Sequence, residues 1–245
     1  MQFIKAKILY RPRKRFIMTD MDIQPRDIYV KNNKATIHGW LFQQRQQQQQ
    51  SDKCKTVLIS HGNAGNISNR GKIIKLLYDI GVNVVIYDYQ GYGKSTGHPS
   101  EDNFYSDGEK MVEYLITDLG VPMDDIILFG ESIGCGVASY LAQKYSCPKV
   151  ILLSGFSSIR DMFHYILPYF SIFGCLITEF PVNRYISRYK GDVLLLHSRD
   201  DELIPYCQAV KNSQFSNCQL IDIEGTHNHP ILDSDVIQYF LENTF

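Results

Sequence analysis

The sequence predicts an α/β fold with a mostly parallel, doubly wound sheet. Short apolar runs of strand length recur along the chain, and segments with helical periodicity separate most of them. Such alternation is typical of a parallel sheet that helices cover on both faces. The length of 245 residues suits one domain of this kind with a large core.

The expected elements follow in order along the chain. Residues 26–30 and Ala35–Phe42 favour strands and flank the turn-forming pair Asn32-Asn33, which predicts an antiparallel hairpin. Further strands are expected at 56–60, 82–87, 126–129, 149–153, 193–197 and 219–223. Helices are expected at 68–78, 101–119 and 132–145, from near Pro205, and at 231–241.

Several segments outside this pattern complete the predicted organisation. Residues 1–24 are expected to form an N-terminal arm, and residues 25–245 the folded domain. Residues 43–52 are a glutamine-rich loop insertion, too poor in apolar groups to pack into a core. Residues 156–191, between two core strands, are expected to form a small helical cap.

Composition and charge exclude several classes of function. A net charge of −1 gives no electrostatic attraction to nucleic acid. The six cysteines contain no C-x-x-C pair, so we expect neither a disulfide framework nor a zinc site, but reduced thiols in an intracellular, cytoplasmic protein. The N-terminus lacks the apolar core of a signal peptide. Its basic segment at 11–15 is either solvated or in peripheral contact with an anionic membrane.

The stretch DIILFGESIGCG at 125–136 predicts a strand that runs through a tight turn into a helix. The G-x-S-x-G pattern at 130–134 places Ser132 between two glycines, as in a nucleophile elbow. Such a turn lifts the serine Oγ out of the sheet, and the dipole of the following helix favours negative charge nearby. The small residues Cys135 and Gly136 suit the start of a packed helix. Ser132 is therefore the predicted nucleophile.

The glycine-rich stretch DYQGYGKSTG at 88–97 does not predict nucleotide binding. A P-loop needs glycine at the position that Asp88 occupies. A dinucleotide fingerprint needs glycine or alanine at the position of Thr96. Both motifs fail where a glycine is sterically required, and we expect no cofactor and no metal.

A serine hydroxyl needs an imidazole base, and the imidazole needs a carboxylate that fixes its tautomer. In an acyl-transfer hydrolase of this fold, the acid follows the serine along the chain and lies in a loop after a strand. Asp201, four residues ahead of Pro205, is the predicted acid. Asp200 is the alternative, and Glu202 is expected to be solvated.

The predicted base lies after the last strand, in EGTHNH at 224–229. His227 is favoured because it sits beside the Gly225-Thr226 turn, and His229 is the alternative. An oxyanion hole needs two backbone N–H donors, one from the residue after the nucleophile, here Ile133. The other is expected from the loop HGNAGN at 61–66, with Asn63 as the first choice and Ala64 as the alternative.

Taken together, HGNAGN, DYQGYGKSTGHPSE, LFGESIGCG, HSRDDELIP and EGTHNH resemble the α/β-hydrolase-domain proteins of the type 13 and type 17 subfamilies. The resemblance covers residues 25–245 and implies an α/β-hydrolase fold with Ser132 as nucleophile, Asp201 as acid and His227 as base. Type 17 members are similar to palmitoyl-protein thioesterases and carry a lipidated, cysteine-rich N-terminus. This chain has no cysteine before Cys54, so we expect that anchor to be absent.

The motifs predict a serine hydrolase that acts through an acyl-enzyme, and the resemblance implies, most specifically, a palmitoyl-protein thioesterase. The expected substrate is an acyl ester or thioester, an S-acylated protein included. A carboxylesterase or lipase acting on small or lipid esters is the alternative, ahead of a serine aminopeptidase or a non-catalytic binding module. The apolar stretch 162–180 of the cap is expected to pack on the core, to line an acyl-chain groove or to contact a membrane surface.

Overall fold

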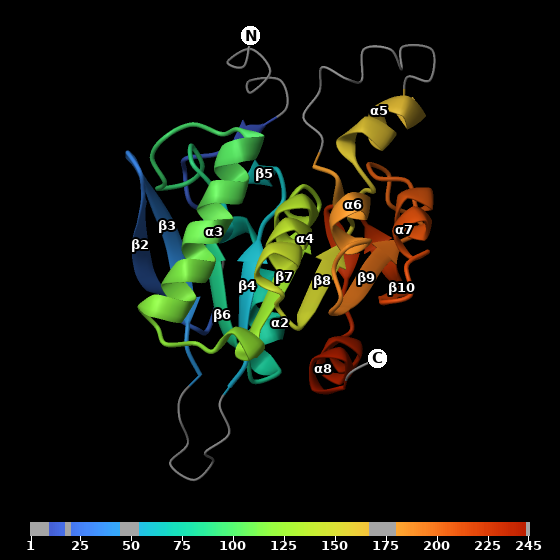
Figure 1. Ribbon diagram of the computed structural model, residues 1–245. Helices are drawn as coiled ribbons and strands as arrows, with labels where there is room; N and C mark the ends of the chain where they lie inside the picture. The colour runs from blue at the N-terminus through green and yellow to red at the C-terminus, as the bar shows by residue number, and fades with distance from the viewer. Residues whose placement is uncertain (1–9, 18–20, 45–53, 167–179, 244–245) are drawn as a thin grey trace. The chain divides into compact units, whose positions relative to one another are not determined.

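The computed structural model describes residues 10–17, 21–44, 54–166 and 180–243. Its chain divides into two compact units, Met1–Ile127 and Leu128–Phe245, which we call unit 1 and unit 2. Figure 1 shows strands and helices alternating through both, which confirms the predicted α/β class. The glutamine-rich residues 45–53 and the cap residues 167–179 lie outside the described part of the chain.

The sheet of unit 1 has the strand order β4-β6-β3-β2. The strands β2 (Arg26–Asn32) and β3 (Ala35–Phe42) form the predicted antiparallel hairpin, and Asn33 in its turn has φ 53°. The fully buried β4 (Thr56–Ser60) runs parallel to β6 (Asn83–Tyr87), as expected for a strand with only apolar or small residues.

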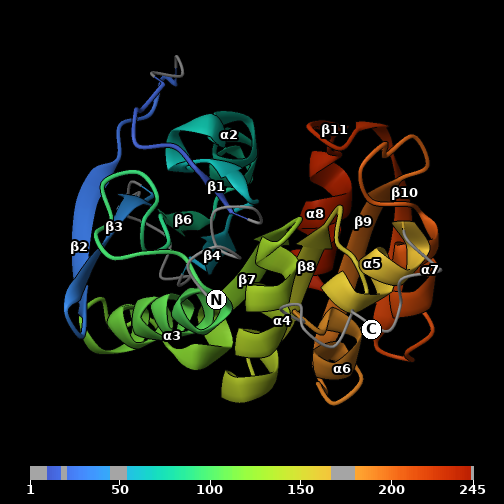
Figure 2. The same ribbon diagram turned by 90° about the horizontal axis from the view of Figure 1, so that it is seen from above.

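Two helices cover opposite faces of the unit 1 sheet, as the view from above shows (Figure 2). Helix α3 (Glu101–Thr117) begins where predicted because the Ser100 side chain caps it by accepting from the Asn103 N–H. The helix predicted at 68–78 is instead split into the 3₁₀ turn η1 (Ile67–Asn69) and α2 (Gly71–Asp79). The split follows from Asn66 and Asn69, whose side chains cap the short turn reciprocally.

The first described residues of the arm are bound to unit 1. Strand β1 (Arg11–Pro12) pairs with β5 (Ala64–Gly65), and the Arg13 N–H donates to the Gly65 carbonyl. The Asn66 side chain donates to the carbonyls of Arg13 and Arg15, both at 3.0 Å. The side chain of Tyr10 is buried with its ring 5.0 Å from that of Phe104. Residues 11–15 of the arm are therefore hydrogen-bonded to the HGNAGN loop, and Tyr10 packs on α3.

The strands of unit 2 follow the order β7-β8-β9-β10-β11, with β7 (Ile126–Glu131) starting at the unit boundary. Strands β8 (Lys149–Leu153), β9 (Asp192–Ser198) and β10 (Cys218–Thr226) are mutually parallel. The short β11 (His229–Ile231) turns back antiparallel to β10. All of β8 and nearly all of β9 are buried, so these strands form the core of the unit.

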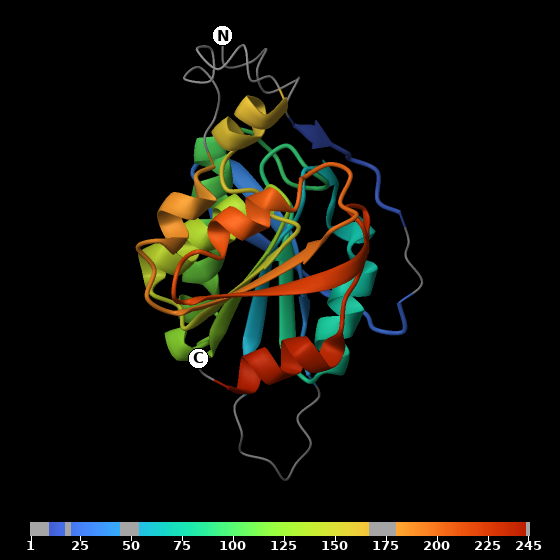
Figure 3. The ribbon, with the colours of Figure 1, turned by 90° about the vertical axis from the view of Figure 1, so that its right-hand side faces the viewer.

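The helices of unit 2 lie on both faces of its strands. Helices α4 (Gly134–Tyr145) and α6 (Val182–Ile186) cover one face, and α8 (Ser234–Glu242) lies on the other (Figure 2). In Figure 3, α7 (Cys207–Asn212), in orange, and α8, in dark red, are separated by β9 and β10. Within residues 156–191, which were expected to form a cap, the first described helix is α5 (Ile159–Ile166).

The prediction of a last helix at 231–241 was wrong at its start. Residues 229–231 pair with β10 as β11, so helical backbone is excluded until Asp233, whose side chain accepts from the Asp235 N–H. Within the described residues, no helix is long and apolar enough to cross a membrane.

Candidate active site

The turn after β7 holds Ser132 in a strained conformation. Ser132 has φ 54°, a left-handed value that a residue with a side chain seldom adopts, and its N–H donates to the Leu153 carbonyl at 2.9 Å. A Cβ at Gly130 would lie 2.6 Å from the Cα of Cys135, so only glycine fits there. The sequence G-x-S-x-G thus forms the tight strand-to-helix turn that it predicts.

Cys135 fills the space beneath this turn. Its Sγ lies 3.3 Å from the Gly130 carbonyl oxygen and 3.4 Å from that of Leu153. The side chain is fully buried, and this burial raises the pKa of its thiol far above the ordinary value. The thiol therefore stays protonated and serves as a small packing group that donates to the elbow carbonyls.

His227 occupies the tip of the tight hairpin between β10 and β11. His227 and Asn228 are the two residues between the strands, and Gly225 before them has φ 95°. A Cβ at Gly225 would lie 2.2 Å from the His229 carbonyl oxygen. The hairpin therefore requires glycine at that position, and it places His227 Nε2 3.1 Å from Ser132 Oγ.

Asp201 contacts the other nitrogen of the same imidazole. Its Oδ2 lies 2.8 Å from His227 Nδ1, while its Oδ1 accepts from the N–H groups of Leu203 and Ile204. Burial opposes ionisation of this carboxyl, but the hydrogen bonds from His227 and from the backbone outweigh burial and lower the pKa of Asp201. The side chain is a buried carboxylate that contacts His227 and its own loop, with His197 Nε2 3.5 Å from its Oδ2.

The partners of the two ring nitrogens determine the tautomer of neutral His227. A carboxylate only accepts hydrogen bonds, so the proton of the neutral imidazole sits on Nδ1 and faces Asp201. The lone pair of Nε2 then faces Ser132 and accepts its hydroxyl proton. This is the arrangement that makes a serine nucleophilic.

Asp200 and His229, the alternatives for the acid and the base, lie outside this hydrogen-bonded group. Asp200 is exposed, and its backbone N–H donates to Ser198 Oγ at 3.0 Å. His229 is exposed on β11. The structure thus brings together Ser132, Asp201 and His227, and neither alternative joins them.

Comparison with known proteins places the chain in a family. Residues 55–174 match the family described as alpha/beta hydrolase fold. An uncharacterized protein of Acanthamoeba polyphaga mimivirus is 33% identical over 219 residues, which cover 80% of this chain and 74% of that protein. The chain belongs to the alpha/beta hydrolase fold family. The alpha/beta hydrolase domain-containing protein aho-3 of Caenorhabditis elegans is 38% identical over 63% of this chain, which spans only 46% of aho-3.

Solved structures share the fold of this α/β hydrolase at low sequence identity. The esterase Pf2001 of Pyrococcus furiosus superposes with a TM-score of 0.68 at 19% identity, covering 95% of this chain and 94% of that one. Est1E of Butyrivibrio proteoclasticus, solved with bound ferulic acid, has a TM-score of 0.69 at 21% identity, covering 88% and 96%. The thioesterase domain of the curacin biosynthetic pathway gives 0.66 at 13% identity, covering 90% and 100%.

The two predicted oxyanion donors lie in different units. Ile133 opens α4 directly after Ser132, and its N–H donates to no acceptor among the described residues. In unit 1, Asn63 Oδ1 accepts from the Tyr92 hydroxyl at 3.0 Å and from the Arg11 N–H at 3.3 Å. The alternative Ala64 is held in β5. Both assignments stay predictions.

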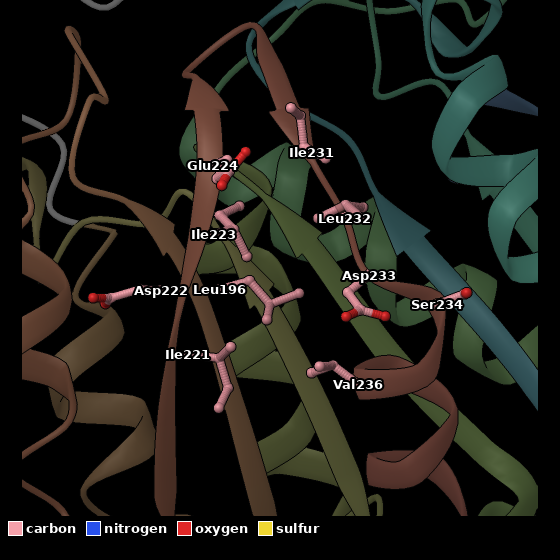
Figure 4. A pocket seen from close by; sticks show the side chains of 10 residues that line it. All are labelled: Leu196, Ile221, Asp222, Ile223, Glu224, Ile231, Leu232, Asp233, Ser234 and Val236. Atoms are coloured by element: carbon pink, nitrogen blue, oxygen red, sulfur yellow. The ribbon is translucent and has the colours of Figure 1, made fainter.

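A hollow of about 580 Å³ in unit 2 is separate from the triad. It lies between β10, β11 and the start of α8, with the apolar side chains of Ile223, Leu232 and Val236 lining it (Figure 4). None of the three triad residues belongs to its wall. In the described part of the chain, no group of three His, Cys, Asp or Glu side chains is placed to hold a metal ion.

Glu202 is exposed to solvent, as expected, but it also has a protein partner that the sequence did not indicate. Glu202 Oε2 accepts from the His227 backbone N–H at 3.0 Å, although the residue is exposed. His197 at the end of β9 is buried and donates from Nε2 to the Ile204 carbonyl at 2.8 Å. The spacing to Pro205 singles out Asp201, but no sequence signal indicates that Glu202 accepts from the main chain of His227.

Proposed function

We propose that this chain is a serine hydrolase that transfers acyl groups through a covalent intermediate on Ser132. The observation that carries the proposal is the continuous hydrogen-bonded series from Ser132 Oγ to His227 and on to Asp201, with distances of 3.1 and 2.8 Å. A chance contact between a serine and a histidine would not explain why a buried carboxylate binds Nδ1, the histidine nitrogen that faces away from Ser132. Membership of the α/β-hydrolase fold family supports the proposal.

In the first half of the reaction, Ser132 Oγ attacks the acyl carbon of the substrate while its proton passes to His227 Nε2. Asp201 stabilises the resulting imidazolium because its carboxylate already accepts from Nδ1–H. The negative oxygen of the tetrahedral intermediate lies at the N-terminus of α4, where the Ile133 N–H is proposed to donate to it. The bond to the leaving group then breaks, and the alcohol or thiol departs with the proton from Nε2.

In the second half, water hydrolyses the acyl-enzyme. His227 Nε2 takes one proton from the attacking water, and the oxygen adds to the acyl carbon. The intermediate collapses by breaking the bond to Ser132 Oγ, which recovers its proton from Nε2. A carboxylic acid leaves, and Ser132, His227 and Asp201 return to their starting state.

The proposed substrates are acyl esters and thioesters. Structural neighbours include an esterase from Pyrococcus furiosus, an enzyme solved with ferulic acid and a thioesterase domain, which supports both linkages. The finer proposal is removal of a long acyl chain from an S-acylated protein, supported by the motif resemblance and by the apolar sequence of the cap. Carboxylesterase activity on small or lipid esters is the alternative within this proposal.

Labelling with a fluorophosphonate tests the catalytic proposal. Such a probe reacts with a serine only where a base activates it, so the wild-type chain should be labelled at Ser132. Ser132→Ala should abolish the label, whereas Ser234→Ala, at an exposed helix start, should keep it. An unlabelled wild-type protein, or a label that persists in Ser132→Ala, would show that Ser132 is not the nucleophile.

A series of p-nitrophenyl esters from acetyl to palmitoyl tests the substrate class. For a long-chain hydrolase, kcat/KM should rise with chain length, and a palmitoylated peptide thioester should be cleaved faster than the matched amide. Activity that stays flat or falls with chain length would exclude the long-chain proposal and favour an esterase for small substrates.

A further inference from the structure

The hairpin that carries His227 is exposed on both sides of its tip, although the His227 side chain itself is only 9% exposed. His227 and Asn228 alone connect β10 to β11, and the flanking Thr226 and His229 are exposed. A two-residue turn sets the register of its strands but does not bury its tip. The position of the imidazole therefore depends on polar contacts that reach the tip from outside the hairpin.

Three residues of one loop make those contacts. The segment 198–204, which we call the acid loop, begins at the last residue of β9. Ser198 Oγ donates to the Gly225 carbonyl at 2.5 Å, and Asp201 Oδ2 accepts from His227 Nδ1. Glu202 Oε2 accepts from the backbone N–H of His227 at 3.0 Å. His227 is thus bound by two adjacent carboxylates, one on its ring and one on its main chain.

We propose that Glu202 is a positioning residue for His227, holding the main chain of the base while Asp201 holds its imidazole. This inference rests on the proposed function, because positioning matters only if His227 acts on Ser132. It assigns Glu202 no contact with the substrate. Its contribution is to keep Nε2 aligned with Ser132 Oγ, 3.1 Å away.

The acid loop is ordered enough to serve as such an anchor. The Leu203 and Ile204 N–H groups donate to Asp201 Oδ1 at 3.0 and 2.7 Å, which closes a tight turn around Glu202. The Ile204 carbonyl in turn accepts from the buried His197. Glu202 therefore projects from a loop whose backbone is fixed on both sides, so its bond to His227 restrains the hairpin rather than the loop.

The charge of Glu202 strengthens this bond. Its pKa is lowered, first of all by the hydrogen bond from the His227 N–H, so the carboxylate is ionised at neutral pH. A charged acceptor makes a shorter and stronger hydrogen bond than a neutral one. A neutral amide oxygen at the same place would keep the geometry with a weaker bond, whereas a methyl group would remove it.

Alanine and glutamine variants separate positioning from general effects of charge. Displacing a catalytic group by about 1 Å can cost about 10²-fold in rate, and loss of one of three tethers should displace His227 less than that. We expect Glu202→Ala to lower kcat about 10-fold with KM unchanged, and Glu202→Gln to recover most of the loss. Glu224→Ala removes a nearby exposed charge on β10 and should leave kcat unchanged.

Amide hydrogen exchange gives a readout that does not depend on turnover. The His227 N–H should exchange about 10-fold faster in Glu202→Ala than in wild type or Glu202→Gln, because its acceptor is gone. The inference is overturned if kcat or the exchange rate of His227 is unchanged in Glu202→Ala, or if Glu202→Gln is as impaired as the alanine variant.

The proposed function can fail separately from this inference. A wild-type protein that no fluorophosphonate labels would overturn both. A wild-type protein that is labelled at Ser132, with Glu202→Ala labelled and turning over at the same rate, would overturn the positioning role alone.

Discussion

At the scale of single residues, the contact between Asp201 and His227 decides which nitrogen of the imidazole is basic. The carboxylate accepts from Nδ1 at 2.8 Å and is further held by two backbone N–H groups. Because all of these donors favour the ionised form, the lowered pKa of Asp201 keeps it charged at any pH where the protein would be assayed. The lone pair on Nε2 is therefore directed at Ser132.

Replacing Asp201 with asparagine tests this arrangement. The amide can present an N–H to Nδ1, which would move the imidazole proton to Nε2 and leave Ser132 without an acceptor. We expect kcat to fall by about 10³–10⁴ in Asp201→Asn, the loss typical of a wrong tautomer. Asp200→Asn, at the neighbouring exposed carboxylate, should stay near wild type. Equal losses in both variants would mean that the acid has been assigned to the wrong residue.

At the level of single residues, the sequence constrains the structure most where sterics fix the residue type. The turn at Ser132 follows from a pattern in which glycines are sterically required, and Gly130 has no room for a side chain. Glu202 could not be predicted, because the partner of an exposed carboxylate depends on a hairpin more than twenty residues away in the chain. Such tertiary hydrogen bonds leave no local periodicity or spacing.

At the scale of elements, a buried lysine on a neighbouring strand binds the C-terminal end of α8, the last helix of unit 2. Lys149, at the start of β8, directs its ammonium group at the carbonyls of Phe240, Leu241 and Asn243. The last carbonyls of a helix have no partners within the helix, and a cation suits the negative end of its dipole. Lys149 therefore fixes the C-terminal end of α8 to the sheet.

Lys149→Met should destabilise the protein while keeping the length of the side chain. The variant leaves the helix carbonyls without a charged donor, and an unsatisfied buried group costs about 1–3 kcal/mol. Chemical denaturation should show a loss of that size, and Lys190→Met, at an exposed lysine of the same unit, should change stability by less than about 0.5 kcal/mol. A Lys149→Met protein as stable as wild type would rule out this anchoring role.

Element prediction worked best for buried strands and least well at helix ends. The apolar runs of β4, β8 and β9 are buried over nearly their whole length, so composition alone identifies them. The start of α8 was missed because β11 pairs with β10, and pairing of three residues is decided by the neighbouring strand. The helix at 68–78 was missed as a unit because the Asn66 cap stabilises a separate turn.

At the scale of the folded molecule, stability should depend on pH through a buried carboxyl in unit 1. Asp107 on α3 accepts from the Gln90 N–H at 2.7 Å and from the side chains of Gln90 and Asn32. Burial raises the pKa of Asp107 to about 6, although these hydrogen bonds oppose the shift. The carboxyl thus links α3 to β2 and to the loop after β6, but its burial there makes it harder to ionise.

The direction in which pH changes the free energy of unfolding depends on the pKa of Asp107 in the unfolded and in the folded protein. In the unfolded chain the carboxyl ionises near pH 3.8, and in the folded protein near pH 6. Between these values the folded protein holds a proton that the unfolded chain has lost, so the free energy of unfolding falls as pH rises. A shift of about two units corresponds to about 3 kcal/mol, fully expressed above pH 6.

Asp107→Asn should remove this pH dependence because the amide does not titrate. Between pH 4 and pH 7, wild type should lose about 2–3 kcal/mol of unfolding free energy beyond any change in the variant, as measured by denaturation at each pH. Asp124→Asn, at an exposed aspartate of the same unit, should follow the wild-type curve. Parallel curves for wild type and Asp107→Asn would show that Asp107 is ionised in the folded protein throughout, and that its three hydrogen bonds outweigh its burial.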